Sequence, residues 1–363
     1  MVIILVLYIF GTIWMCWNVT QMKKLTIVDT VKPFVSILIP LRNEESHIKN
    51  LIKNLQELDY TNIEFILYDD DSDDDTLNKA IHHTATDHRF QIIKGGLLPN
   101  GWKGKPHACH QLSSYAQGDI FLFLDADVLL KPQTVDAVIA SMVVNKADAI
   151  SCFPHFRNSS FLEYCLTPLL HFFIYMHLPI RLSNNQKLLT ATAASGAFIA
   201  VTSTCYHAIG GHTSVKNNIV EDVTLFQNIK KNHFNALLLR GSDFVECKMY
   251  GSSSATWQGF LKNCFAAFHH SYLTAIAIIF VYTLYYLSPF ALLIYGLFSG
   301  QWWTIIPYLC ITIQRLISDY LSKNINLFSL LMPLSAALYI ALLLTAMYKY
   351  TVNDKTSWKG RLL

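Results

Sequence analysis

The apolar residues of this 363-residue chain are concentrated at its two ends, and this distribution limits what the chain can fold into. Residues 1–19 and 272–348 are both apolar over a length sufficient to span a bilayer. The first stretch lacks a basic start and a small-residue cleavage site, and Lys23 and Lys24 follow it directly. We therefore expect a retained membrane anchor over 1–20. Since positive charge stays on the cytoplasmic side, we expect the segment after Lys23 to lie in the cytoplasm.

The C-terminal apolar region, 271–348, contains three segments, at 272–298, 302–320 and 327–348. The middle segment carries Arg315 and Asp319. Three crossings would put the basic tail, 349–363, outside the cell, against the usual charge bias. Two crossings and one interfacial helix keep the tail in the cytoplasm. We prefer an even number, which predicts a multi-pass cell-membrane protein.

Composition argues against other classes of protein. The net charge is only +3, and the sequence has no basic run interleaved with aromatic residues of the kind that binds along a nucleic-acid backbone. We therefore expect no nucleic-acid partner. The eight cysteines show neither a CxxC pair nor metal-type spacing. We expect reduced thiols that pack in the interior, as in a cytosolic domain. Nothing in the sequence indicates the oligomeric state.

Between the apolar ends, residues 30–270 alternate between strand and helix patterns. We expect strands at 35–43, 63–70 and 90–95, and helices at 44–58, 76–86 and 107–117. Such alternation predicts an α/β domain with a mostly parallel sheet and crossover helices. Ligands of these sheets bind outside the carboxyl ends of the strands.

Residues 120–130 read IFLFLDADVLL, an apolar run interrupted by Asp125 and Asp127. Strand alternation would direct both carboxylates to the same side of a buried strand. Like charges so close together need a compensating cation, so the pair predicts a hard divalent ion and a diphosphate ligand. An Asp-rich turn at a strand end is the alternative.

Five motifs in order resemble family 2 glycosyltransferases with the GT-A fold. They are IPLRNEE (39–45), DDDSDDDT (69–76), GWKGKPHAC (101–109), DAD (125–127) and VED (220–222). SGAFIAVTSTCYHAIGGH (195–212) and KMYGSSSATWQGFLKN (248–263) are similar to the branch that glycosylates membrane lipids, which includes hopene-associated and carotenoid-acid enzymes. The resemblance implies a GT-A sheet with flanking helices, plus transmembrane helices at both ends.

The resemblance places the nucleotide-sugar donor at the ends of the first two strands. Pro40, Arg42 and Glu44 would hold uracil and ribose, and Asp70 would meet the base edge. The family more often has glycine where Asp71 stands. The alternatives are a helix start capped by Asn43 and a solvated acidic turn.

The resemblance assigns the remaining residues of the nucleotide-sugar site to the diphosphate and its metal ion. Lys105 would contact the diphosphate or the ribose, although a surface lysine is the usual explanation for a lone Lys. Asp127 would be the main ligand of Mg²⁺ or Mn²⁺, and Asp125 would support it through water or the ribose. The ion would neutralise charge on the leaving nucleoside diphosphate.

The VED motif would supply the base. Asp222 is the candidate for taking the acceptor's proton, with Glu221 as a positioning acceptor. The alternative is an acid pair that caps a helix. Attack from the opposite face gives inversion. His107, Gly196 and Trp257 are candidate acceptor contacts.

The acceptor class is inferred from the membrane. Residues 154–182 are apolar and aromatic inside the 30–270 domain, so we expect a lipid-facing interfacial segment there, with a buried core helix as the alternative. No QxxRW motif of processive polymerases occurs, so we expect one transfer. Our first hypothesis is transfer of glucose from UDP-glucose to a carotenoid acid such as 4,4'-diaponeurosporenoate; a hopanoid, ceramide-like lipid or diacylglycerol is the alternative acceptor. A non-catalytic lipid-handling partner is the second hypothesis.

Overall fold

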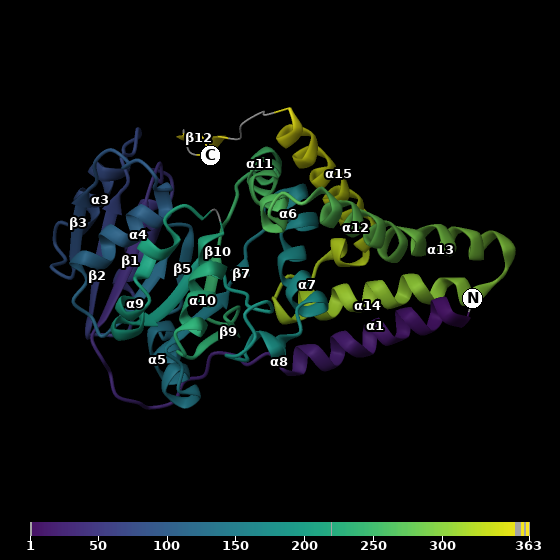
Figure 1. Cartoon of the computed structure of the whole chain (residues 1–363), viewed down its shortest axis with the longest axis horizontal. Coiled ribbons are helices and arrows are strands. Elements are labelled where there is room, and N and C mark those ends of the chain that lie inside the picture. Colours follow the sequence, from purple (N-terminus) through teal and green to yellow (C-terminus); the bar gives the residue numbers. More distant parts are fainter. Residues whose placement is uncertain (1, 219, 353–356, 359–360, 363) are drawn as a thin grey trace. The chain divides into compact units, whose positions relative to one another are not determined.

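The computed structural model describes residues 2–218, 220–352, 357–358 and 361–362. The expected basic tail therefore lies partly outside the described residues. The chain divides into two compact units. Unit 1 comprises Met1–Gln21, Phe156–Ile180 and Met249–Leu363, and unit 2 comprises Met22–His155 and Arg181–Lys248. Figure 1 labels their elements.

Unit 2 is built on a seven-stranded sheet in the order β3-β2-β1-β4-β8-β6-β9 (Figure 1). β1 is parallel to both β2 and β4, whereas β8 is antiparallel to β4 and β6. The predicted α/β fold with a mostly parallel sheet is confirmed. The strands are β1 (Val35–Leu41), β2 (Ile63–Asp69), β3 (Phe90–Lys94), β4 (Ile120–Leu124), β6 (Ala149–Phe153), β8 (Phe198–Thr202) and β9 (Ala236–Arg240).

The helices of unit 2 connect these strands. They are α2 (Ile48–Gln56), α3 (Thr76–Thr84), α4 (Gly104–Tyr115), α5 (Thr134–Asn145), α8 (Ile180–Ser183, at the unit boundary), α9 (Ser203–Ala208), η1 (Gly211–Val215) and α10 (Glu221–Lys231). Two predicted starts were wrong. α2 begins at Ile48 instead of residue 44, because Asn43 is left-handed (φ 52°) and the chain must turn before it becomes helical. α4 begins at Gly104 instead of residue 107, after the extended Lys103.

The two DAD aspartates do not lie in a strand. β4 ends at Leu124, and β5 (Val128–Leu130) begins after a turn in which the Val128 N–H donates to the Asp125 carbonyl at 3.1 Å. The argument from strand alternation was therefore wrong, although the turn still keeps the two carboxylates close in sequence at the end of β4. β5 pairs antiparallel with β10 (Val245–Cys247), and the short β7 (His155–Phe156) lies at the unit boundary.

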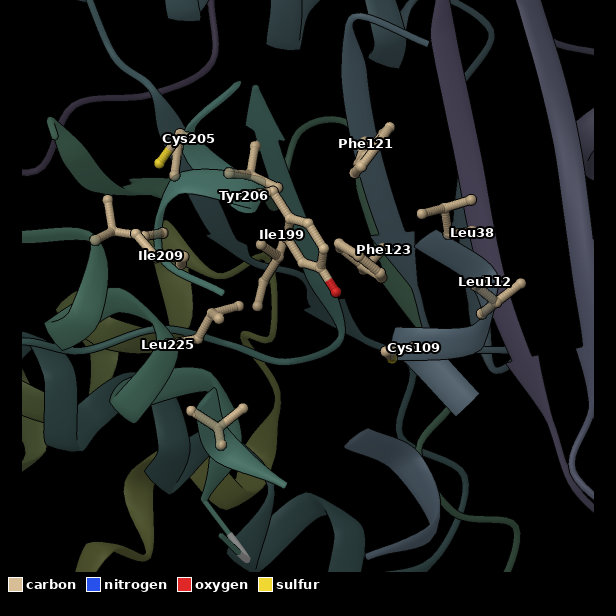
Figure 2. Close-up of a cluster of buried hydrophobic side chains, with 14 of the residues drawn as sticks. Leu38, Cys109, Leu112, Phe121, Phe123, Ile199, Cys205, Tyr206, Ile209 and Leu225 are labelled. Carbon is tan, nitrogen blue, oxygen red and sulfur yellow. The ribbon is translucent and has the colours of Figure 1, made fainter. Parts of the chain in front are cut away.

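The core of unit 2 locks α4 and α10 against the sheet (Figure 2). Phe123 of β4 packs against Tyr206 of α9, with ring centroids 5.3 Å apart. Leu112 of α4 and Leu225 of α10 belong to the same buried cluster. Each fully buried large apolar side chain contributes about 1.5–3 kcal/mol. The first turns of both helices are thereby held in place in unit 2.

Unit 1 is helical. Its elements are α1 (Val2–Thr20), α6 (Phe161–Leu166), α7 (Pro168–His177), α11 (Ser253–Cys264), η2 (Ala266–Phe268), α12 (Tyr272–Tyr282), η3 (Thr283–Leu287), α13 (Ser288–Ser299), η4 (Trp302–Ile305), α14 (Ile306–Leu321), η5 (Leu327–Leu330), α15 (Met332–Thr351), β11 (Ser357–Trp358) and β12 (Arg361–Leu362). Among the described residues, three helices are long and apolar enough to cross a membrane: Val2–Thr20, Tyr272–Ser299 and Met332–Thr351.

The middle C-terminal segment is different, because α14 buries a salt bridge. Arg315 Nε donates to Asp319 Oδ2 at 2.8 Å, and both side chains are fully buried. Ser329 also donates to Asp319, at 2.7 Å. A buried charge needs such a paired and hydrogen-bonded partner. The two charges in this segment thus have a packing role inside unit 1.

The apolar segment at 154–182 forms α6 and α7 within unit 1. Leu169, Phe172 and Tyr175 of α7 are buried there, as in the core-helix alternative. All eight cysteines are free and seven are buried, which confirms the prediction of packing thiols.

Candidate functional site

Four segments of unit 2 bring a charged cluster together around Lys105. We call Lys105, Asp125, Gly196, Glu221 and Asp222 the Lys105 cluster. Lys105 Nζ lies 2.6 Å from Asp125 Oδ1 and 3.6 Å from Glu221 Oε1. These residues come from the first turn of α4, the end of β4, the loop before β8 and the first turn of α10. Sequence analysis assigned all five to the site, but to four separate roles.

Gly196 joins the two halves of the cluster through its backbone. Its carbonyl accepts a hydrogen bond from Lys105 Nζ at 3.1 Å, and its N–H donates to Asp222 Oδ2 at 2.7 Å. A Cβ at this position would lie 3.1 Å from Lys105 Nζ and 3.3 Å from Asp222 Oδ2. Any larger residue would therefore crowd the cation and the carboxylate. Glycine allows this close approach without displacing either side chain.

Burial and mutual charge set the protonation of the cluster. Burial raises the pKa of Glu221, and Lys105 opposes the shift. Burial also raises the pKa of Asp222, and the hydrogen bond from the Val223 N–H partly offsets this rise. For Lys105, burial lowers the pKa, but Asp125 and Glu221 more than reverse this and keep the amine charged. Its side chain is still 35% exposed, so a ligand can reach it.

The VED acids also serve their own helix. Glu221 and Asp222 occupy the first turn of α10, where negative charge is favoured by the helix dipole. Asp222 Oδ1 accepts from the Val223 N–H at 2.8 Å. The helix-capping alternative thus describes a real contact. It does not account for the bonds to Gly196 or the proximity of Glu221 to Lys105.

The two loops assigned to the nucleotide brace each other. Arg42 Nη1 donates to the carbonyls of Asp70 and Asp71 at 2.5 and 2.6 Å. The Asn43 N–H donates to Ser72 Oγ at 3.0 Å. Arg42 therefore shapes the site by holding the second loop, a role that the sequence did not suggest.

Pro40, Glu44 and Asp70 lie on the same two strand ends. Pro40 of β1 pairs in register with Tyr68 of β2. The Glu44 N–H donates to Thr76 Oγ1 at 2.8 Å, and its carboxylate contacts His47 at 2.9 Å. Asp70 is only 4% exposed. The Glu44 and Asp70 carboxylates are thus built into the loops, whereas Asp71, Asp73, Asp74 and Asp75 are exposed, as in the solvated-turn alternative.

The departure from glycine at position 71 has a physical explanation. Asp71 has φ 58°, in the left-handed region. Glycine enters this region freely, and aspartate is one of the few other residues that enter it readily. The loop therefore keeps the backbone turn that glycine would favour.

His107 lies away from the contacts of the cluster. Its ring is buried in α4, edge-on to Trp102 with centroids 5.5 Å apart and to Tyr68 at 6.2 Å. The packing interpretation accounts for these contacts.

Asp125 and Asp127 are suitable ligands for a hard divalent ion. No group of three or more His, Cys, Asp or Glu side chains arranged to hold a metal occurs in the described part of the chain. However, Mg²⁺ binds through one or two carboxylates together with water and substrate phosphates. The turn between β4 and β5 offers two such carboxylates, and the Cys247 thiol hydrogen-bonds to Asp127. The donor set fits Mg²⁺ or Mn²⁺ carried with a diphosphate.

Unit 1 contains an apolar cavity of about 610 Å³ that sequence analysis did not predict. It is lined by side chains of α7, α11 and α12 and by Tyr339 of α15. Met249, Tyr250, Gly259, Phe260 and Asn263 line it as well, and all belong to the KMYGSSSATWQGFLKN motif. Trp257 does not line it. The motif was the available signal for this cavity, but the motif residues that line the cavity are neighbours of Trp257 in the sequence.

Residues 36–203 match the family described as Glycosyl transferase family 2. The segment includes the strand ends of the nucleotide loops, Lys105, the DAD turn and Gly196. Glu221 and Asp222 lie beyond it.

Curated relatives are similar over a longer stretch. A 4,4'-diaponeurosporenoate glycosyltransferase of Staphylococcus haemolyticus is 26% identical over 236 residues, which are 63% of this chain and 60% of that protein. The enzyme of the same name from Staphylococcus aureus strain MRSA252 is 26% identical over 219 residues, 60% of this chain and 56% of that protein. The match thus covers less than two thirds of these relatives' length.

A solved structure shares the fold across both chains. It is the mannosyltransferase PcManGT from Pyrobaculum calidifontis in complex with GDP-Man and Mn²⁺. The TM-score is 0.57, the identity is 16%, and the match covers 98% of each chain. At this identity the likeness establishes the fold, with the GT-A sheet in both.

Proposed function

We propose that the chain transfers a sugar from a nucleotide-sugar donor to a membrane lipid, because residues 36–203 match the family described as Glycosyl transferase family 2. The Lys105 cluster is the observation that carries the proposal. It combines one cation, three carboxylates and a glycine in the first turns and loops beside the strand ends. This is where ligands bind in such sheets.

The donor in our proposal is UDP-glucose. Pro40, Arg42, Glu44 and Asp70 form or brace the loops that would hold its uracil and ribose. Lys105 would meet the diphosphate, because its amine stays charged and is partly accessible. Asp125 orients this amine at 2.6 Å.

Asp127, supported by Asp125, would hold Mg²⁺ or Mn²⁺. When bound, the ion supplies positive charge that neutralises the leaving nucleoside diphosphate. Two carboxylates on one turn are the chain's contribution to that site.

Asp222 is the proposed base. The acceptor oxygen forms a bond to C1 of the sugar while the bond from C1 to the diphosphate oxygen breaks, and the leaving group takes the electron pair. A hydroxyl acceptor passes its proton to Asp222, whereas a carboxylic-acid acceptor is already ionised at neutral pH and attacks as its carboxylate. The raised pKa of Asp222 is closer to the pKa of an effective general base at neutral pH than that of an ordinary aspartate. Gly196 holds it at 2.7 Å, and the displacement inverts C1.

The acceptor in our proposal is a lipid, with a carotenoid acid as the first choice. The names of the curated relatives and the shared motif support this choice. The apolar cavity of unit 1 suits the lipid's chain, since sites of roughly 300–1,000 Å³ with few polar groups bind apolar ligands. His107 and Trp257 remain weaker candidates, because neither lines the cavity.

We further propose that the chain is a multi-pass protein of the cell membrane with its catalytic domain, about 30–270, in the cytoplasm. α1 and two C-terminal helices have spanning length. An even number of C-terminal crossings, together with Lys23 and Lys24 after α1, favours this orientation.

The test uses the purified full chain with labelled UDP-sugars, Mg²⁺ or Mn²⁺ and membrane lipid extracts. Mass spectrometry of the lipid product should show one added hexose on a carotenoid acid. A hexose found on a hopanoid, a ceramide-like lipid or diacylglycerol would show that this lipid, and not a carotenoid acid, is the acceptor. Failure to transfer or hydrolyse any nucleotide sugar, with or without metal, would favour a non-catalytic lipid-handling partner.

A further inference from the structure

Unit 2 has an open, shallow cavity at its surface, of about 700 Å³, whose charged lining residues are all basic. Lys23, Arg181 and Lys187 line it, together with side-chain amides and two leucines. None of the lining residues is acidic. We call this cavity the basic pocket. Three cations without a carboxylate in the same wall repel one another, so the pocket favours an anion.

The wall of the basic pocket is held rigidly by the edge of the sheet. β9 is an edge strand, and Asn184 pairs with it through both atoms of its amide, accepting from the Leu238 N–H at 2.8 Å and donating to the Leu238 carbonyl at 3.1 Å. Gln186 does the same with Ala236, at 3.0 and 3.3 Å. The loop that carries Lys187 is therefore fastened to β9. A fixed wall lowers the entropy cost of binding a ligand.

Lys23, which lies in the segment that follows α1, lines the same pocket. The Arg240 N–H donates to its carbonyl at 2.9 Å, so its backbone is anchored to the end of β9. Its amine donates to Asn145 Oδ1 at 2.7 Å, a neutral partner that leaves its charge uncompensated. Asp148 contacts one lining residue, since its carboxylate accepts from the backbone N–H of Asn235 at 2.7 Å.

The sequence keeps Lys23 of the basic pocket close to a membrane surface if α1 spans the bilayer. Lys23 stands three residues after Thr20, the end of α1. Three residues extend at most about 10 Å, which is about one Debye length at 0.1 M salt. We propose that the basic pocket binds the phosphate of an anionic membrane-lipid headgroup through Lys23, Arg181 and Lys187. The proposal is independent of the transfer reaction.

The test measures lipid binding to the purified full chain in detergent. Short-chain phosphatidylglycerol, short-chain phosphatidylcholine and inorganic phosphate are titrated separately and followed by native mass spectrometry. The wild type should bind phosphatidylglycerol more tightly than the other two probes. The Lys187→Gln variant should weaken its binding about fivefold, and the triple variant Lys23→Gln, Arg181→Gln, Lys187→Gln about a hundredfold.

A matched triple variant separates the pocket from general charge. Lys49→Gln, Lys131→Gln and Lys231→Gln remove the same number of exposed cations elsewhere in unit 2 and should leave the affinity unchanged. Equal weakening in both triple variants would overturn the proposal. Equal affinity for the two lipids would also overturn it, and inorganic phosphate binding as tightly as phosphatidylglycerol would exclude a lipid headgroup. The singly substituted variant keeps the test valid if the triple variant misfolds.

Discussion

The Lys105 cluster in unit 2 concentrates charge, whereas the apolar cavity in unit 1 excludes it. In the cluster, burial raises the pKa of Glu221 and Asp222, and one lysine offsets their charge. In the cavity, residues of α7, α11 and α12 leave few polar groups. The cluster suits the breaking of the bond between sugar and diphosphate, and the cavity suits binding of the apolar chain of a lipid. Substitutions should therefore separate the chemical rate from the affinity for the lipid.

Of the single substitutions, removal of the base should have the largest effect. With a hydroxyl-bearing lipid acceptor, Asp222→Asn should lower kcat by about 10²–10⁴, the usual contribution of general base catalysis; with a carboxylic-acid acceptor, which is already ionised, the loss should be smaller. The amide still fits beside Gly196 but cannot take a proton. The rate of product formation at saturating donor and acceptor measures this. Asp29→Asn, at an exposed position outside the cluster, should change nothing; equal rates for Asp222→Asn and wild type would exclude Asp222 as the base.

The pH profile should show the same base. Burial raises the pKa of Asp222, so the carboxylate gains its proton at a higher pH than an ordinary aspartate, which titrates near about 3.9. A base works only when ionised. We expect kcat/KM to fall about tenfold per pH unit as the pH drops below this raised pKa. Initial rates across the acidic range measure the limb, and a limb at the ordinary aspartate value would contradict the assignment.

Changing the cavity should affect acceptor binding instead. A Cβ at Gly259 would lie within van der Waals overlap of the Tyr250 ring, and both residues line the cavity. Gly259→Ala should move this ring and raise the KM for the lipid about tenfold, the effect of roughly 1.4 kcal/mol. The KM for the nucleotide sugar should stay constant.

A neighbouring glycine provides the control for that change. A Cβ at Gly251 would meet nothing within 4 Å, so Gly251→Ala should leave both KM values unchanged. Steady-state kinetics with each substrate varied in turn makes the comparison. A rise in the nucleotide-sugar KM in Gly259→Ala would show that the two regions are not separable.

The smallest effect concerns backbone strain in the nucleotide loops. Asp71→Gly should stabilise the folded chain by up to about 1 kcal/mol, because glycine adopts a positive φ without strain. The gain is limited by the larger entropy of glycine in the unfolded state. Thermal unfolding of the two proteins tests this. A lower Tm for the glycine variant would mean that the Asp71 side chain stabilises the loop.

Local patterns were enough to predict the sheet but not the contacts made across it. The strands at β1, β2 and β3 followed from apolar runs and turn residues, which depend on neighbours in sequence. The bond from Arg42 to the Asp70 carbonyl depends on two loops meeting in space. The same holds for Gly196, which joins Lys105 and Asp222 across 91 and 26 residues of chain. No periodicity encodes such contacts.

The cavity was hidden for the same reason. Its lining extends from Leu170 to Tyr339, and only the motif at 248–263 hinted at it. The DAD turn shows the opposite error, since the two aspartates were predicted together for a reason that was wrong. A turn, not strand alternation, holds them.

The most direct test of the account replaces both aspartates of that turn. The full chain with Asp125→Asn and Asp127→Asn is compared with wild type for transfer of labelled sugar into lipid, with Mg²⁺ or Mn²⁺ varied. We predict a loss of at least about 10³ and no response to metal, because the diphosphate loses its site. A double variant that transfers sugar at the wild-type rate with the same metal response would contradict the account.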